Sequence, residues 1–396
     1  MKTKLLGISL FLFTATLVAF YPWLRGAATT TILSRQGTST QGPAAVEVVF
    51  VLDTTGSMSG LIETAKEKVW SIATTMAQAD QAPTISMGLV AYRDRGDDYV
   101  TQVIDLSTDL DSMYAALMDF SADGGGDGPE SVNRALDDAI HSISWSQNPS
   151  SYKVVFLVGD APPHMDYQGE TRYPEIAAAA VARGIVINTI QCGEVQQTVQ
   201  PWKQIALLGK GAYFQVEQAG GAFAVATPFD EDIALLSAEL DQTRLYYGST
   251  EEREEKEVKV AATQKLHELS SLASRARRAV FNTSAAGVAN LFGERELVED
   301  IQSGRIDLDD IAAEELPETL RAMAPAEQQA AIARTATERT SLRQRIDGLA
   351  AQRDNFIAGK VEEAGGADDS LDQKIYELVR DQAAPKGLDY ASGPKF

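Results

Sequence analysis

The first half of the chain alternates short apolar runs with segments of helical spacing. The apolar runs predict six strands, at residues 46–52, 84–92, 99–106, 153–159, 184–192 and 212–216. The intervening segments, two of which have a proline near their start, predict helices at 60–79, 109–119, 129–144, 174–183, 198–208 and 230–245. This order is typical of a sheet domain in which each strand is followed by a helix.

The character of the strands predicts how the sheet is built. Solidly apolar strands that alternate with helices indicate an α/β fold, with a doubly wound and mostly parallel sheet covered on both faces. The segment between 84–92 and 99–106 is too short for a crossover helix, so this pair is predicted to be antiparallel at a sheet edge. Ligands of such folds bind at the carboxyl ends of the strands.

Beyond Tyr247 the pattern predicts helices alone. Residues 251–259 (EEREEKEVK) are highly charged, and no convincing strand follows them. Near-heptad spacing over 326–359 predicts a long helix, which we expect to pack on its own chain; a short coiled coil is the alternative. Residues 361–370 are predicted to form a loop, and residues 386–396 a frayed end.

The N-terminal residues have the features of an export signal. Lys2 and Lys4 precede an uncharged run from Leu5 to Leu24. The run is long for a cleaved signal and approaches the length that spans a bilayer, so it is either removed near Ala28, which we prefer, or kept as an inner-membrane anchor. In both cases the remainder is predicted to face outward from a bacterial cell, in the periplasm or at the cell surface.

Four segments are therefore predicted along the chain. They are an export signal or membrane anchor over 1–28, a linker rich in Thr, Ser, Gly and Gln over 29–44, the sheet domain over 45–247 and the helical region, partly similar to a coiled coil, over 248–396.

Composition narrows the possible partners. A content of 44% hydrophobic residues can build globular cores, and a formal charge of -21 without a basic stripe argues against binding to nucleic acid. The lone Cys192 excludes an internal disulfide framework and a Cys-rich zinc site, and we expect it to be a small buried residue at a strand end.

Side chains with oxygen atoms follow two of the predicted strands. Asp53, Thr55 and Ser57 occupy alternate positions in DTTGSM, directly after the first strand, and on a tight loop such side chains converge as ligands for a hard cation. Asp160 closes the strand 153–159, and Asp127 lies in the loop that precedes the helix at 129–144. These loops are predicted to meet at one edge of the sheet.

These motifs resemble those of the von Willebrand factor A family. Its metal ion-dependent adhesion site combines a D-x-S-x-S loop, a Thr from a second loop and an Asp from a third. Asp53, Thr55 and Ser57 match the first loop, and Asp160 matches the third. The spellings DTTGSM, AYRD, GGGDGPE and GDAPPH are similar to those of the hemicentins and of myosin heavy chain kinase relatives. The resemblance covers residues 45–247 and implies the family's Rossmann-like fold.

One departure from the family concerns the second loop, where Asp127 takes the place of the Thr. The alternatives for Asp127 are a hydrogen bond to the loop or contact with the metal through water. An additional carboxylate would strengthen the resting affinity for metal and weaken the ion as an electrophile. The resemblance implies a divalent cation, with Mg²⁺ favoured over Mn²⁺ or Ca²⁺, whose open position accepts an acidic residue of a protein partner. In better-studied members of the family the domain's last helix moves with occupancy; the corresponding helix is expected here at 230–245, and whether this chain switches stays open.

Other readings of the same residues remain open. Asp53 or Ser57 alone would serve as a helix cap, and Arg93 and Asp94 form either an ion pair at the site or a solvated loop pair. His164 is predicted to be a surface or capping residue. The glycines at 124–126 lack the Lys of a phosphate loop, so they are expected to let the backbone approach the cation.

Three functions follow from these interpretations. The preferred one is a non-enzymatic adhesion or scaffold module that binds protein through the metal. The alternatives are a metal-dependent hydrolase and a structural membrane tether whose metal site is vestigial. The hydrolase is disfavoured because the chain has three histidines and Met58 stands where G-x-S-x-G needs its nucleophile.

Overall fold

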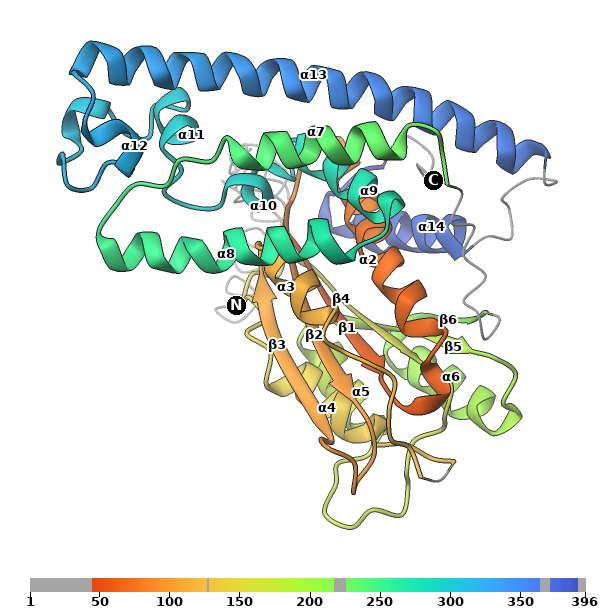
Figure 1. Ribbon diagram of the computed structural model, residues 1–396. Coiled ribbons are helices and arrows are strands. Elements are labelled where there is room, and N and C mark those ends of the chain that lie inside the picture. Colours follow the sequence, from red (N-terminus) through yellow and green to blue (C-terminus); the bar gives the residue numbers. More distant parts are fainter. Residues whose placement is uncertain (1–44, 127, 217–225, 364–370, 391–396) are drawn as a thin grey trace, which may run out of the picture. The chain divides into compact units, whose positions relative to one another are not determined.

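A single six-stranded sheet organises the first half of the protein (Figure 1). The computed structural model describes residues 45–126, 128–216, 226–363 and 371–390. The strands are β1 (Ala45–Asp53), β2 (Thr84–Tyr92), β3 (Thr101–Ser107), β4 (Tyr152–Gly159), β5 (Ile185–Cys192) and β6 (Lys210–Val216). Their order is β3-β2-β1-β4-β5-β6, and all neighbours pair in parallel except β2 and β3. The predicted α/β sheet with one antiparallel edge strand is confirmed.

Five helices connect the strands. They are α2 (Leu61–Met76), α3 (Leu110–Leu117), α4 (Val132–His141), α5 (Tyr173–Ala182) and α6 (Gln196–Leu208). Each was predicted, but α4 begins three residues after the expected start at 129. The helix begins later because the backbone of Glu130 pairs with the loop after β4. The Glu130 amide donates to Pro162 O at 2.9 Å, and the Glu130 carbonyl accepts from His164 N at 3.0 Å.

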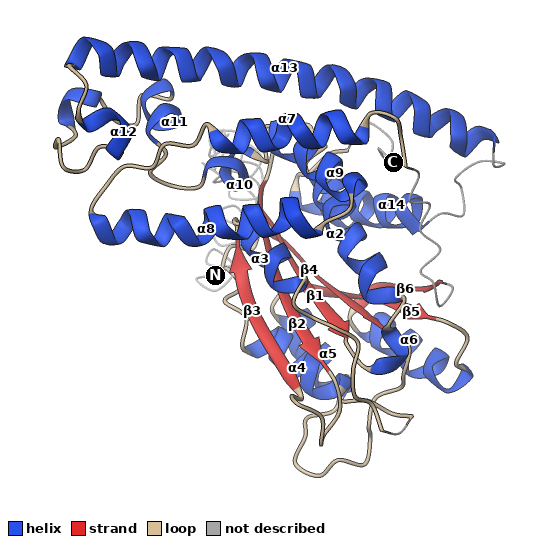
Figure 2. Cartoon of the chain, viewed as in Figure 1, coloured by secondary structure: helices blue, strands red, loops and turns tan. Residues whose placement is uncertain are grey.

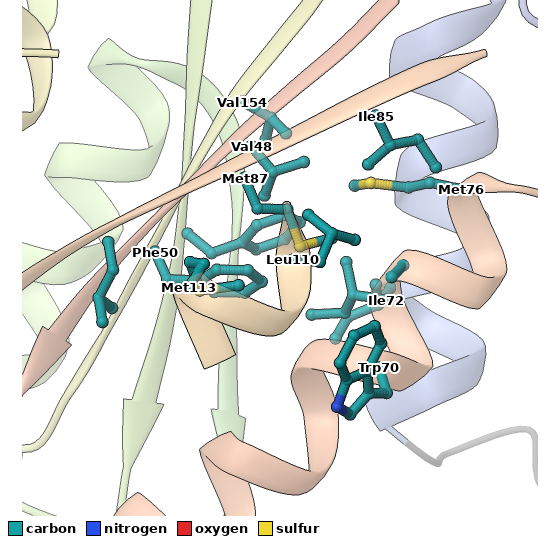
Figure 3. Packing of buried hydrophobic residues seen from close by; sticks show 14 of the residues in the cluster. Val48, Phe50, Trp70, Ile72, Met76, Ile85, Met87, Leu110, Met113 and Val154 are labelled. Carbon is teal, nitrogen blue, oxygen red and sulfur yellow. The ribbon is translucent and has the colours of Figure 1, made fainter. Parts of the chain in front are cut away.

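Both faces of the sheet are buried, which explains the continuous apolar strands. Alternate residues of β1 enter different cores: Val48 and Phe50 contribute to one, and Val49 and Val51 to the other. Figure 3 shows the first core, where side chains of α2 and α3 such as Trp70 and Met113 pack on β1, β2 and β4. The second core is formed with α4, α5 and α6. Cys192 is buried at the end of β5, as predicted.

The described residues after Val216 form helices and no strand, which confirms the helical C-terminal region (Figure 2). The helices are α7 (Asp230–Gln242), α8 (Thr250–Leu269), α9 (Leu272–Thr283), α10 (Val288–Phe292), α11 (Leu297–Gln302), α12 (Glu318–Arg321), α13 (Pro325–Glu363) and α14 (Leu371–Ala383). Short 3-10 helices lie at η1 (Gly56–Met58), η2 (Leu308–Asp310) and η3 (Ala384–Lys386). No helix among these described residues is both long and apolar enough to cross a bilayer.

The long helix α13 packs against α7, α9 and α11 of its own chain. Its buried face carries Leu342, Ile346 and Ile357, together with two arginines. Arg339 makes a bidentate pair with Glu296, at 2.8 and 2.7 Å, and Arg353 donates to Asp230 Oδ1 at 2.9 Å. This is the packing that we expected, and the coiled coil stays a prediction.

Helix α14 returns to the sheet. Ile375 and Val379 belong to the first core, and Gln382 accepts a hydrogen bond from the Tyr152 hydroxyl at 2.7 Å. Leu388 and Tyr390 are also buried, so the prediction of a frayed end is wrong for these two residues. By contrast α7, which was expected to close the sheet domain, packs against α9 and α13.

Several predicted segments lie outside the described residues. They are the export signal or anchor over 1–28, the linker over 29–44, most of the loop over 361–370 and the last residues, 391–396. The boundary between sheet domain and helical region at residue 247 also stays a prediction.

A buried ionic cluster joins the helices of the C-terminal region to the sheet domain. Arg278 of α9 is fully buried. Its Nε donates to Asp111 Oδ1 of α3 and its Nη1 donates to Asp241 Oδ2 of α7, each at 2.7 Å. Burial alone would raise the pKa of both aspartates, but the Arg278 guanidinium outweighs it and holds each pKa well below its usual range. One guanidinium therefore bridges carboxylates from both parts of the protein.

Substitution of Arg278 by Met is expected to lower the free energy of unfolding by about 3–5 kcal/mol, because two buried carboxylates lose their main counter-charge. Urea denaturation of the full chain measures the change. Arg334→Met, at an exposed position of α13, is the matched control and should remain within about 0.5 kcal/mol of the parent. A loss for Arg278→Met no larger than that of the control would show that the cluster does not stabilise the fold.

Candidate metal centre

The loop that leaves β1 brings three predicted ligands together. Asp53 is the last residue of β1, and its Oδ1 accepts hydrogen bonds from the Thr55 amide at 2.9 Å and the Thr55 hydroxyl at 2.6 Å. The Ser57 hydroxyl lies 3.1 Å from that of Thr55. The tight turn of η1 produces this convergence, as the alternate spacing of the three residues predicted.

The fourth predicted ligand, Asp160, comes from the neighbouring strand. β1 and β4 pair in parallel, with Leu52 opposite Val158, so the residues that follow both strands lie side by side. Ser57 Oγ donates to Asp160 Oδ1 at 3.0 Å. Asp127, the fifth predicted ligand, lies outside the described residues, and its assignment stays a prediction.

The buried oxygen atoms at this edge suit a cation. Asp53 is fully buried, and its Oδ2 has no hydrogen-bond partner within the described part of the chain. Burial, reinforced by the charge of Asp160, raises the pKa of Asp53 to about 7 in spite of the hydrogen bonds from Thr55. A helix-cap role alone would leave Asp53 Oδ2 without a partner, whereas a positive ion would satisfy it.

The ligand set would combine carboxylates with hydroxyl groups. In the described ranges no three His, Cys, Asp or Glu side chains lie close enough to hold a metal ion by themselves. Asp53 and Asp160 with Thr55 and Ser57 offer two carboxylates and two hydroxyls, a set of hard oxygen ligands suited to Mg²⁺ or Ca²⁺.

The glycine-rich segment approaches the first loop closely. Gly56 N donates to Gly124 O at 3.1 Å, and Gly125 has a φ of +81°. A Cβ atom added at Gly125 would lie 3.1 Å from the Thr55 Cβ, so the absence of a side chain lets the two loops meet. The close approach seen here is to the neighbouring loop, and the expected approach of the backbone to a cation stays a prediction.

Two buried residues at this edge were not among the predicted site residues. Glu130 is 3% exposed, and burial followed by the charges of Asp53 and Asp94 raises its pKa to about 9. Tyr92 ends β2, and its buried hydroxyl has no hydrogen-bond partner among the described residues. In the sequence Glu130 has the features of an ordinary acidic residue at a helix start, and Tyr92 those of a core aromatic residue. Their residue types therefore did not indicate a place in the site.

Arg93 and Asp94 stabilise the loops around the site through hydrogen bonds. Arg93 donates to the carbonyl oxygens of Thr54 at 3.2 Å and Ser121 at 2.9 Å. Asp94 accepts from the hydroxyls of Ser131 and Tyr167, each at 2.7 Å. Both charged residues are 5% exposed, so the solvated loop pair is not what the structure contains.

His164 is buried rather than on the surface, contrary to the prediction. Its ring stacks on Tyr167 with centroids 4.0 Å apart, and its Nδ1 lies 2.8 Å from Asp166 Oδ1. Its Nε2 lies 3.4 Å from Asp94 Oδ2. The stack holds the loop after β4 beside the candidate centre.

Comparison of the sequence with known protein families identifies the family of the sheet domain. The family model described as the von Willebrand factor A domain matches residues 47–227. The alpha-protein kinase vwkA of Dictyostelium discoideum is 30% identical over 122 residues, which is 30% of this chain and 19% of that protein. The chain therefore spans about a fifth of the length of this relative.

Solved structures with a similar fold include two that cover 44% of this chain. The VWA domain of SpRpn10 is 16% identical, with 89% of that chain covered and a TM-score of 0.34. The proximal thread matrix protein 1 of the mussel byssus, solved with a zinc-occupied MIDAS motif, is 14% identical, with 42% covered and a TM-score of 0.34.

Substitution of Gly159 by Ala is expected to destabilise the protein by about 1–3 kcal/mol, because the core around it is already packed. The added Cβ would lie 2.5 Å from the Tyr92 hydroxyl oxygen and 2.8 Å from the Asp53 Cβ. Thermal denaturation followed by circular dichroism measures the effect. Gly126→Ala, with open space around its added Cβ, is the control, and equal melting temperatures for the two variants would contradict the described packing.

Proposed function

Because residues 47–227 of this chain form a von Willebrand factor A domain, we propose that the protein is a binding module that docks an acidic residue of a protein partner through a divalent cation. The observation that carries the proposal is the convergence of Asp53, Thr55, Ser57 and Asp160 through hydrogen bonds. The second carboxylate oxygen of Asp53, Oδ2, is buried and has no partner among the described residues. We infer Mg²⁺ as the ion, with Mn²⁺ or Ca²⁺ as alternatives.

The chain's own residues would hold the cation in an incomplete shell. Asp53 and Asp160 would supply negative charge, and the hydroxyls of Thr55 and Ser57 would supply neutral oxygen ligands. When bound, the cation supplies an exchangeable coordination position that a carboxylate can fill. Arg93 and the Gly124 carbonyl keep the first loop in place, so little reorganisation is needed when a partner binds.

The position of the loops supports docking. Strands β1 and β2 point away from α7 and α13, so the loops that follow them lie at the opposite end of the sheet from these helices (Figure 1). A partner that approaches this end would not meet the long helices.

Binding, rather than catalysis, is the activity that we propose. Ser131 and His164 both contact Asp94, so the carboxylate lies between the hydroxyl and the imidazole. A Ser-His-Asp triad needs the imidazole in the middle, where it can take the proton of the hydroxyl. The kinase named among the relatives matches only over 19% of its length, and its activity is not carried over to this chain.

Metal binding is tested by isothermal calorimetry of the full chain with Mg²⁺, Mn²⁺ and Ca²⁺. The parent should bind at least one of these ions and release it to a chelator, and an Asp53→Ala, Asp160→Ala double variant should bind none, because both carboxylates are removed. Glu338→Ala with Asp309→Ala, at exposed positions of the helical region, is the control for loss of charge. A double variant that binds like the parent would overturn the proposed centre.

Partner docking is tested next on immobilised parent protein. Candidate partner proteins are those that the immobilised protein retains in Mg²⁺ and releases when chelator is added. In each candidate, the acidic residue thought to fill the coordination position is then changed to its amide. Retention that is insensitive to both the chelator and the amide substitution would contradict docking through the ion.

We also propose that the protein is exported from a bacterial cell and works in the periplasm, at the inner membrane or at the cell surface. The basis is the pair Lys2 and Lys4 before the apolar run Leu5–Leu24. Fractionation of cells should place the protein outside the cytoplasm, and N-terminal sequencing should show a start near residue 29 or an intact N-terminus in the membrane fraction. Recovery in the cytoplasm would contradict export.

A further inference from the structure

We propose that Glu130 is an additional carboxylate of the cation site, which faces the bound ion through water on the side of the glycine-rich loop. This inference rests on the cation binding proposed above.

The backbone places Glu130 where three loops meet. Its amide donates to Pro162 O at 2.9 Å and its carbonyl accepts from His164 N at 3.0 Å, which ties it to the loop that begins with Asp160. On the other side, Gly124 O accepts from Gly56 N in the loop that carries Thr55 and Ser57. Glu130 therefore contacts one of the ligand-bearing loops directly and follows a segment that contacts the other.

The side chain of Glu130 lies beside the predicted ligands. It is 3% exposed. A Cβ atom added at Gly125 would lie 3.1 Å from Glu130 Oε1 and also 3.1 Å from the Cβ of Thr55, so the carboxylate and Thr55 flank the same small space. A side chain at position 125 would press on both.

Two buried carboxylate oxygens at this point lack partners. Glu130 Oε2 and Asp53 Oδ2 each have no hydrogen bond within the part of the chain that the structure describes. Asp53 contacts Thr55 through Oδ1, and Glu130 Oε1 and Thr55 lie on the same space beside Gly125. A buried charged group without a partner is costly, so two at one place call for a common positive charge or a common set of donors.

A hydrated cation meets this requirement. Mg²⁺ usually keeps several waters, which can donate hydrogen bonds to carboxylates that do not touch the ion. Contact through water also agrees with the spacing of the acidic groups, because no three of the described acidic, His or Cys side chains are close enough to hold an ion directly.

The competing explanation is that Glu130 only holds its loop in place. The two roles differ in what an amide would do. Glu130→Gln keeps the size and most of the hydrogen-bonding capacity of the side chain and removes the charge. A purely structural Glu130 would leave metal affinity unchanged after this substitution, whereas a carboxylate of the cation site would not.

The experiment is calorimetric titration of Mn²⁺ into the full chain and into Glu130→Gln, Asp127→Asn and Asp53→Ala variants, with melting temperatures measured in chelator. We expect Glu130→Gln to raise the Kd by about 10- to 100-fold, the usual effect of losing a group that orients metal ligands. Its melting temperature in chelator should stay close to that of the parent, because Gln keeps the size and most of the hydrogen-bonding capacity of the side chain. Asp127→Asn tests the separate prediction that Asp127 is a ligand, which a raised Kd would support.

The outcomes separate the two proposals. A parent that binds Mn²⁺ with a Glu130→Gln Kd within about threefold of its own overturns the role of Glu130 alone. A parent that binds no Mn²⁺ overturns the proposed function itself. If Glu130→Gln does not fold, Glu130→Ser, which removes the charge and leaves room for water, is judged by the same change in Kd.

Discussion

The pairing of β1 with β4 in parallel is the constraint on which the candidate centre depends. Parallel strands in register end at the same edge, so the residues that follow them are forced together whatever their chemistry. Here those residues are Asp53 and Asp160, and the tight turn at η1 adds the hydroxyls of Thr55 and Ser57. Two acidic groups placed this closely in a buried setting repel each other, and their arrangement is stable only if something positive or several donors offset that repulsion.

The rest of the sheet domain holds this unfavourable arrangement in place. The two apolar cores fix β1 and β4 from both faces, and Arg93 and the His164–Tyr167 stack fix the loops from the sides. Apolar packing away from the edge thus fixes the strands, and the polar groups at the edge are held both by these neighbours and by hydrogen bonds to one another. Such an arrangement is typical of binding sites that are formed before the ligand arrives.

The sequence predicted features that depend on periodicity and on strand ends. Six strands, the antiparallel edge and the grouping of Asp53, Thr55, Ser57 and Asp160 follow from local patterns and from one rule about parallel sheets. Features that depend on contacts between distant segments were not predicted. Glu130 is drawn into the site by pairing with Pro162, and His164 is buried by stacking on Tyr167. The return of α14 to the sheet rests on contacts such as Gln382 with Tyr152, for which no local pattern gives a signal.

The return of α14 has a consequence for the order in which the protein can fold. One face of the sheet is covered in part by Ile375, Val379 and Tyr390, near the end of the chain, although the strands they cover are made first. During synthesis, that part of the face stays exposed until these residues have emerged. Contacts between segments so distant in sequence form slowly, since the chain between them must first be brought together. The sheet therefore cannot complete its packing as an early, independent unit. The C-terminal helix α14 must fold onto the sheet before the first core is complete.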